Sequence, residues 1–197
     1  MLETLDLLLA AIVISAVVLH FLGRKLPLLW RFVGLFSILC ISLLPYPYGL
    51  STWLLSYISG FSITTGILAL LAIESVLWGR YTVKQEQMQI FYVLLSITAL
   101  VFYPSSMGAM GFDAYSYGYG NFTLSSALLA IGMIAWFKRF YLLCLILATA
   151  QIAFAAELLI SDNLWDYLLD PCLVIFAMCR VVKGAFCKEK TIPAQAI

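Results

Sequence analysis

The sequence has few charges and only one histidine. Of its 197 residues, 11% are charged and 64% are hydrophobic, whereas soluble domains contain about a quarter charged and about half apolar residues. A soluble fold of this composition would have too few polar side chains to cover its surface. The composition therefore predicts that the apolar excess faces lipid and that the chain is an integral membrane protein.

The sequence also lacks the motifs of common membrane enzymes. It contains no HExxH zinc motif, no Cys/His metal cluster, no nucleotide-binding glycine loop and no Ser/His/Asp set. One histidine cannot supply both axial ligands of a bis-histidine haem, and no basic arm or patch suggests nucleic-acid binding. We therefore expect no cofactor and no nucleic-acid partner, and these absences favour a non-enzymatic function.

What the sequence does contain is a series of apolar runs separated by short polar breaks. A helix needs about 20 residues to cross a hydrocarbon core about 30 Å thick, and seven runs approach that length: 4–23, 27–45, 60–79, 88–104, 121–137, 140–160 and 164–182. A further short helix over 50–58 is expected to lie on the outer face of the membrane. The predicted fold is an all-α, polytopic bundle of transmembrane helices over 1–187, followed by a short cytoplasmic tail over 188–197.

The charges between the runs predict an orientation. Lys and Arg of short loops stay on the cytoplasmic side of a membrane, and with the N-terminus outside all 11 basic residues fall in cytoplasmic segments. Arg31 lies inside the second run and is expected to extend its side chain towards that interface. We therefore expect an N-out, C-in protein of the plasma membrane, as in a bacterial inner membrane, with the lipid bilayer as its surroundings. The acids concentrate on the outer side, at Glu3, Asp6, Asp113, Asp162, Asp166 and Asp170.

The first candidate site is an acidic stretch at the start of the last run. Its carboxylates recur every four residues, a spacing that places them on one face of a helix, and they belong to Asp162, Asp166 and Asp170. Glu157 is close in sequence, and no outward Lys or Arg is available to neutralise the group. Such carboxylates repel, raise one another's pKa, or bind a cation such as Mg, Ca or Mn. The alternative is that Ser161 or Asp162 caps the helix and the acids suit its dipole.

The second candidate site is the outer loop over 104–120, which is long for a chain whose other connections are short. Asp113 supplies its charge, and Tyr115, Tyr117 and Tyr119 alternate with small residues. An extended segment would place the three rings on one side, where they could hold a sugar, a lipid headgroup or the periplasmic domain of a partner. The alternative is that the tyrosines anchor the loop at the lipid headgroups.

A third feature is a possible polar pair near the cytoplasmic side. His20 is the only histidine and Glu74 lies within a span at similar depth, so the two could form a buried hydrogen-bonded pair or a proton-handling couple. The structural pair is favoured, because one His and one Glu at the same face do not form a relay across the bilayer.

These features leave three hypotheses for function. The first is an accessory or subunit protein that engages membrane partners, periplasmic partners or lipids at its outer face. The second is a lipid- or headgroup-handling enzyme that uses the outer carboxylates. The third is a small transporter or channel, which requires a polar seam from His20 and Glu74 to the outer acids.

Overall fold

The fold consists of helices throughout the part of the chain that is described. The computed structural model describes residues 4–120 and 122–189, and these form nine α-helices and two short 3-10 helices without a strand. The predicted all-α class is therefore confirmed. Glu3 and the tail over 190–197 lie outside the described residues, as do the side chains of Arg24 and Lys188.

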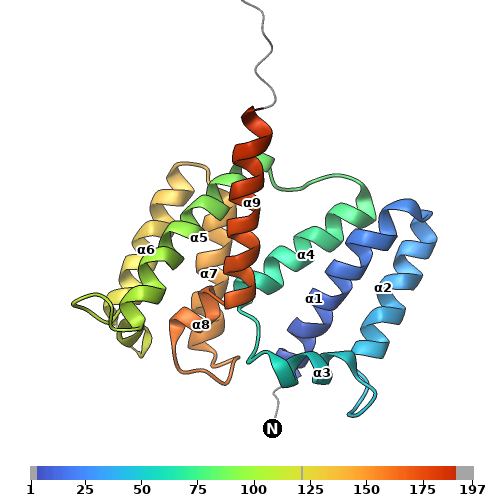
Figure 1. The fold of residues 1–197 in the computed structure, drawn as a ribbon, viewed down its shortest axis with the longest axis horizontal. Helices are drawn as coiled ribbons and strands as arrows, with labels where there is room; N and C mark the ends of the chain where they lie inside the picture. The colour runs from blue at the N-terminus through green and yellow to red at the C-terminus, as the bar shows by residue number, and fades with distance from the viewer. Residues whose placement is uncertain (1–3, 121, 190–197) are drawn as a thin grey trace, which may run out of the picture.

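Seven longer helices alternate in direction through the described chain (Figure 1). We call the end that holds the start of the first helix the lower end, and the end at which the last helix finishes the upper end. The seven are α1 (Thr4–Leu22), α2 (Leu28–Ser42), α4 (Ile63–Trp78), α5 (Gln85–Ser106), α6 (Phe122–Phe137), α7 (Tyr141–Ala155) and α9 (Pro171–Glu189). Two short helices, α3 (Leu50–Tyr57) and α8 (Leu164–Leu168), lie at the lower end (Figure 1).

The helices agree with most of the predicted ranges. The first six apolar runs each coincide with one long helix, and the short helix expected over 50–58 is α3. By length and hydropathy together, α1 and α5 reach the size of a membrane span, while α2, α4, α6 and α7 are apolar but shorter. Membrane crossing and the position of α3 on an outer face stay predictions.

The prediction of one helix over 164–182 is wrong. Helix α8 ends at Leu168, Leu169 is extended (φ −128°, ψ 136°), and α9 begins at Pro171. The residue before a proline avoids the α conformation, and proline suits the first helical position because it needs no hydrogen bond there. Asp170 then acts as the N-cap of α9, since its Oδ1 accepts the Leu173 N–H at 2.8 Å.

Helices α1 and α4 run in the same direction and approach each other closely. Ala10, Ala11 and Ser15 are fully buried on α1, and a Cβ added to Gly66 on α4 would lie 2.5 Å from Leu9 Cδ2. Small residues at a helix contact let the two backbones come near and gain van der Waals contact. With α2 and α3 packed beside them, these helices form one half of the molecule.

The other half is built from α5 to α9. Tyr92 of α5 packs edge-on against Phe176 of α9 with 5.7 Å between ring centroids, and the Arg180 guanidinium lies 5.9 Å from the centre of the Tyr92 ring. Helix α6 packs on α7. The two halves meet where α4 contacts α7 and α8, so α4 is the helix that joins them (Figure 1).

Arg31 binds within the protein at the upper end. Its Nη1 donates to the Val76 carbonyl at 2.6 Å, and its Nε donates to the Leu26 carbonyl at 2.9 Å. Val76 belongs to the last turn of α4, where carbonyls have no partner in their own helix and carry the negative end of the dipole. Its charge therefore caps α4 and ties α2 to it, and the expectation that the side chain extends towards the cytoplasmic interface stays a prediction.

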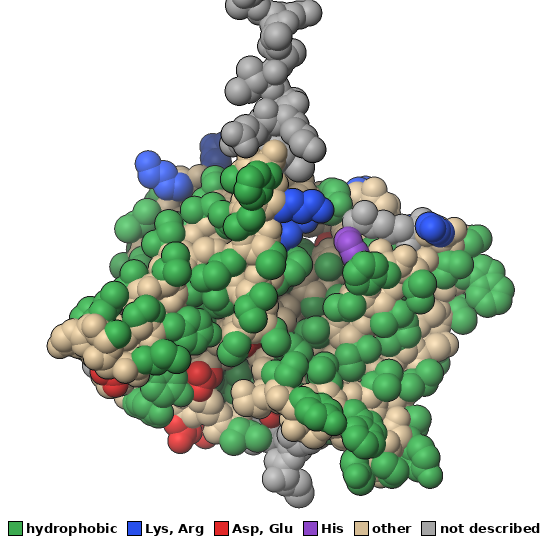
Figure 2. All heavy atoms as spheres, in the orientation of Figure 1, with side chains coloured by type: hydrophobic (Ala, Val, Ile, Leu, Met, Phe, Trp, Pro, Cys, Tyr) green, Lys and Arg blue, Asp and Glu red, His purple; other side chains and the backbone are tan. Residues whose placement is uncertain are grey.

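Charged side chains gather at opposite ends, with an apolar surface between them. Figure 2 shows Lys and Arg towards the upper end, most of the visible Asp and Glu towards the lower end, and hydrophobic side chains around the sides. Several large hydrophobic side chains are highly exposed on this surface. Among them are Phe21, Phe36, Phe122 and Phe137, each more than 70% exposed. The described basic side chains all lie in the upper half, at Lys25, Arg31, Arg80, Lys84, Lys138, Arg139, Arg180 and Lys183.

Candidate binding site at the lower end

The loop after α5 is folded rather than extended. Helix α5 continues past Pro104 to Ser106, and a 3-10 helix forms over Tyr115–Gly118. Asp113 starts this turn, because its Oδ1 accepts the Tyr115 N–H at 2.9 Å. The local hydrogen bonds of the turn replace the extended backbone that the alternating tyrosines suggested.

The three tyrosines therefore do not share one side. Tyr115 is half-buried and packs against Phe102 at 6.2 Å and edge-on against Tyr119 at 5.4 Å between centroids. Tyr117 and Tyr119 are exposed at 47% and 56%. The predicted row of three rings is thus corrected to one inward ring and two accessible ones.

This loop is docked onto the segment that contains α8. Asn163 is fully buried. Its Nδ2 donates to the Tyr115 carbonyl, and its Oδ1 accepts the Trp165 N–H at the start of α8, both at 2.9 Å. Trp165 Nε1 donates to the Ala114 carbonyl at 2.9 Å. A Cβ on Gly118 would lie 1.8 Å from Asn163 Oδ1, so only glycine permits this approach.

Asp166 is part of the same docked arrangement. Its Oδ2 accepts hydrogen bonds from Tyr115 Oη at 3.0 Å and from Ser161 Oγ. Burial raises the pKa of Tyr115 above its ordinary value, and hydrogen bonds with Tyr119 and Asp166 raise it further by favouring the neutral phenol. Tyr115 is therefore a protonated donor at physiological pH, and the Asp166 carboxylate is held by hydroxyl groups.

Asp170 is buried at the junction between the two halves of the molecule. Only 5% of its surface is exposed. Its Oδ2 accepts the Ser62 N–H at 3.0 Å, the Ser62 hydroxyl at 2.7 Å and the Thr65 hydroxyl. Because Ser62 and Thr65 start α4 and Asp170 starts α9, this carboxylate joins helices from the two halves.

The three aspartates of the predicted acidic stripe are consequently in three different environments. Asp162 is exposed, Asp166 is bound to loop hydroxyls, and Asp170 is buried against α4. They do not lie on one helix face, because α8 has only five residues and a new helix starts at Pro171. Among the residues that the structure describes, no three His, Cys, Asp or Glu side chains are grouped so that they could hold a metal ion.

Two of the predicted acids line a pocket together with one of the loop tyrosines. The pocket has a volume of about 370 Å³. Its carboxylates come from Glu157 and Asp162, and its aromatic wall comes from Tyr119, Phe154 and Tyr167. The structure thus brings together members of both predicted outer sites that are distant in sequence.

The position of Glu157 follows from how α7 ends. After Ala155 the chain turns through Glu157, whose φ of 50° lies in the left-handed region. Its N–H donates to the Phe154 carbonyl at 3.0 Å, and the Leu158 N–H donates to the Ala153 carbonyl at 3.1 Å. Glycine is the usual residue at such a helix end. A glutamate there costs conformational energy and presents a carboxylate at the pocket.

The opposite wall of the pocket is fixed by Tyr167. Its side chain is 1% exposed, and its hydroxyl accepts the Leu159 N–H at 3.1 Å and donates to the Leu159 carbonyl at 3.2 Å. Both hydrogen bonds pin the 157–161 turn against α8. The pocket is therefore preorganised on this side, while Glu157, Asp162 and Tyr119 remain accessible to solvent.

The lower end carries no compensating positive charge in the described part of the chain. The described carboxylates there belong to Asp6, Asp113, Glu157, Asp162, Asp166 and Asp170, whereas all eight described Lys and Arg side chains lie in the upper half. A concave site with charge of one sign attracts ligands of the other sign. Carboxylates beside an aromatic ring suit an ammonium group in particular.

His20 and Glu74 both lie towards the upper end. Glu74 accepts a hydrogen bond from the Thr82 hydroxyl, and His20 is exposed in the last turn of α1 with its ring 5.6 Å from that of Phe21. Their pairing with each other stays a prediction. Below them the packed faces of α1 and α4 are mostly apolar, with buried Ala16, Ala69 and Ile73, although Ser15 and Thr64 are buried as well. The transporter hypothesis, which requires a polar seam, stays a prediction.

Several residues that position the site were not anticipated from the sequence. Asn163 holds the loop, Tyr167 holds the pocket wall, and Ser62 and Thr65 bind Asp170. The Asp-Pro pair at 170–171 is a local signal for a helix start. The partners on α4 lie more than 100 residues away, and spacing along the chain carries no signal for them.

Comparisons with protein-family models, curated proteins and solved structures find no match to this chain. The lower-end pocket, which we define by Tyr119, Phe154, Glu157, Asp162 and Tyr167, offers the most specific chemistry in the described part of the chain.

Proposed function

We propose that the chain is an integral membrane protein with seven spans, its lower end outside the cytoplasm and its upper end inside, in a plasma membrane such as a bacterial inner membrane. Seven alternating helices of 15 to 22 residues support this, since they measure about 22 to 33 Å against a hydrocarbon core of about 30 Å. The exposed aromatic and aliphatic side chains around their sides favour lipid over water as the solvent.

The orientation is supported by the charges. All eight described basic side chains lie in the upper half, and six described carboxylates lie at the lower end. Insertion leaves Lys and Arg on the cytoplasmic side. The short helices α3 and α8 and the loop over 107–120 would then lie at the outer surface, where amphipathic segments are stable.

Within the membrane the protein acts as an accessory factor that binds an ammonium group at the lower-end pocket. The observation that carries this proposal is the pairing of the Glu157 and Asp162 carboxylates with the exposed Tyr119 ring in one pocket. The ammonium belongs either to the headgroup of an aminophospholipid or to a lysine on the extracytoplasmic segment of a partner. Asp166 and Asp170 already accept hydrogen bonds from within the protein, which favours binding over catalysis by the acidic stretch.

A charge-neutral double variant, Glu157→Gln with Asp162→Asn, tests the proposal. Hydrogen bonds to a charged partner contribute about 1.5 to 3 kcal/mol, so the loss of both charges should weaken binding at least about tenfold. The matched control is Asp113→Asn, which removes an exposed carboxylate that does not line the pocket and keeps an amide oxygen to accept the Tyr115 N–H. It should bind as the wild type does.

Two measurements distinguish the sources of the ammonium. Equilibrium binding of a short-chain phosphatidylethanolamine, compared with phosphatidylglycerol, detects a headgroup ligand. A carbodiimide, which couples carboxylates to amines, detects a lysine by cross-linking the pocket to a neighbouring protein. Loss of the positive signal in the double variant, with retention in Asp113→Asn, supports the proposal. Equal signals in the wild type and the double variant in both measurements would refute it.

A further inference from the structure

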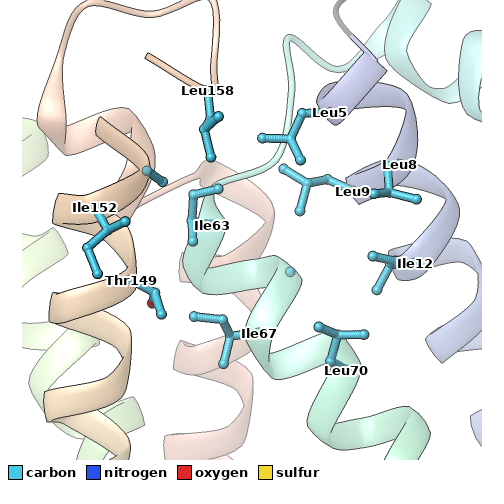
Figure 3. A pocket seen from close by; sticks show the side chains of 12 residues that line it. Leu5, Leu8, Leu9, Ile12, Ile63, Ile67, Leu70, Thr149, Ile152 and Leu158 are labelled. Atoms are coloured by element: carbon cyan, nitrogen blue, oxygen red, sulfur yellow. The ribbon is translucent and has the colours of Figure 1, made fainter. Parts of the chain in front are cut away.

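A second concave site lies on the side of the molecule, between its two halves. It is a groove of about 360 Å³ between α1, α4 and α7. Figure 3 shows Leu5, Leu9 and Ile12 of α1, Ile67 of α4 and Ile152 of α7 directed towards the same space. The close approach of α1 and α4 at Gly66 forms its floor, and α7 forms the facing wall.

The groove is apolar along its length. Eleven of its twelve lining residues are aliphatic or glycine, and the remaining one is Thr149. The Thr149 hydroxyl already donates to the Leu145 carbonyl at 2.7 Å in its own helix. No polar group of the groove therefore requires a hydrogen bond from an occupant, and a hydrocarbon satisfies it fully.

The groove occupies the lower part of the bundle. On α1 it reaches from Leu5 to Ile12, and on α4 it reaches from Ile63 to Leu70. Seven residues of helix correspond to about 10 Å, which is within the half-thickness of a hydrocarbon core of about 30 Å. If the lower end faces outwards, the groove lies in the outer leaflet.

The dimensions of the groove decide between its possible occupants. A volume of about 360 Å³ over about 10 Å corresponds to a cross-section of about 36 Å², less than half that of an α-helix about 10 Å wide. A stable dimer needs about 20 residues or more on each side, whereas twelve residues line this groove. The groove is thus too narrow to take up a whole helix and too small to form by itself the interface with a second copy, but an acyl chain one methylene wide fits.

We propose that the acyl chain of an outer-leaflet phospholipid occupies the groove between α1, α4 and α7. This inference rests on the proposed membrane location. The acyl chain fills a gap beside the junction of the two halves, where van der Waals contact with lipid replaces contact between helices. A bound lipid therefore contributes to holding the halves together.

The experiment uses the full chain in vesicles of phosphatidylethanolamine and phosphatidylglycerol that contain a phospholipid with a photoactivatable diazirine on its acyl chain. Cross-links are mapped by mass spectrometry at Leu70 in the groove and at Leu129 on α6. The two leucines are matched, because each is the seventh residue after the first residue of its helix and they are 52% and 60% exposed. If an acyl chain is bound in the groove, the lipid should label Leu70 several-fold more than Leu129.

A filling variant provides the second readout. Leu70→Trp should reduce the labelling of the groove residues Ile12 and Ile152 several-fold, and Leu129→Trp should leave it unchanged. Equal labelling of Leu70 and Leu129 in the wild type would overturn the proposal. Labelling of Leu129 without Leu70 would also overturn it and indicate a protein segment as occupant. Labelling of neither leucine would instead contradict the membrane location on which the inference rests.

Discussion

Replacing Asp170 should weaken the contact between the two halves of the molecule. Its carboxylate is 5% exposed and accepts hydrogen bonds from the Ser62 N–H, two hydroxyl groups and the Leu173 N–H. Asp170→Ala removes the acceptor for all of them. The change therefore affects the start of α4 and the start of α9 together.

The size of the effect follows from these contacts. Loss of the N-cap of α9 costs about 1 kcal/mol, and each buried donor left without an acceptor costs about 1 to 3 kcal/mol. The Ser62 N–H has no alternative partner of its own helix at that position, whereas the Ser62 hydroxyl can still bond to Thr65 at 3.2 Å. We therefore expect Asp170→Ala to lower the free energy of unfolding by about 3 kcal/mol.

The assay is denaturation of the detergent-solubilised protein by sodium dodecyl sulfate, followed by tryptophan fluorescence. Asp170→Asn should fall between wild type and Asp170→Ala, because its amide oxygen can accept on one side while its NH₂ opposes a donor on the other. Asp162→Ala is the matched control, since Asp162 is exposed and should change stability by less than about 0.5 kcal/mol. If Asp170→Ala were no less stable than Asp162→Ala, the inferred tie between the halves would be refuted.

Three further variants test other contacts. In a tyrosinate absorbance titration, Tyr115→Phe should have one fewer tyrosine that ionises above the ordinary value of 10.0 than wild type has, because burial and the hydrogen bond to Asp166 raise the pKa of Tyr115. The raised pKa means that this contribution to stability is complete below pH 10 and is lost as the pH rises further. Arg31→Ala should lower the denaturation midpoint by removing a cap on α4 worth about 1 to 2 kcal/mol. Glu157→Gly should raise stability by about 1 kcal/mol by relieving a positive φ, while it weakens ammonium binding.

For each of the three variants, one result would contradict the expectation. If as many tyrosines ionised above pH 10 in Tyr115→Phe as in wild type, the raised pKa would not belong to Tyr115. An Arg31→Ala variant as stable as wild type would mean that the guanidinium contributes no net energy at the end of α4. If Glu157→Gly bound ammonium as wild type does, the carboxylate at that turn would have no part in the pocket.

The helices were predictable because their signal is local. Apolar runs bounded by polar residues located the long helices and α3, since a helix satisfies its own backbone and needs only an apolar surround. The break at Asp170 and Pro171 was the exception. The four-residue spacing of the acids favoured one continuous helix. Pro171, however, disfavours the helical conformation at Asp170, so the helix is interrupted there.

The geometry of the candidate site was predictable only in part. Charge asymmetry directed attention to Glu157 and Asp162, and the alternating tyrosines directed it to Tyr119, and the pocket brings these three residues together. The alternating tyrosines predicted an extended segment with three rings on one side, and this was wrong. The hydrogen bonds of the turn that begins at Asp113 stabilise a 3-10 helix there instead. The partner of Asp170 on α4 depends on tertiary packing, which no spacing within one segment encodes.

Cysteine labelling tests most directly whether the protein spans a membrane with its lower end outside. Single cysteines are placed at Tyr117, in the lower-end loop, and at Lys183, near the upper end, after the five native cysteines are replaced by alanine. Both positions are exposed. With an impermeant maleimide on intact cells, Tyr117→Cys should be labelled, and Lys183→Cys should be labelled only after the membrane is permeabilised. Labelling of Lys183→Cys from outside, or recovery of the protein in the soluble fraction, would contradict the proposed topology.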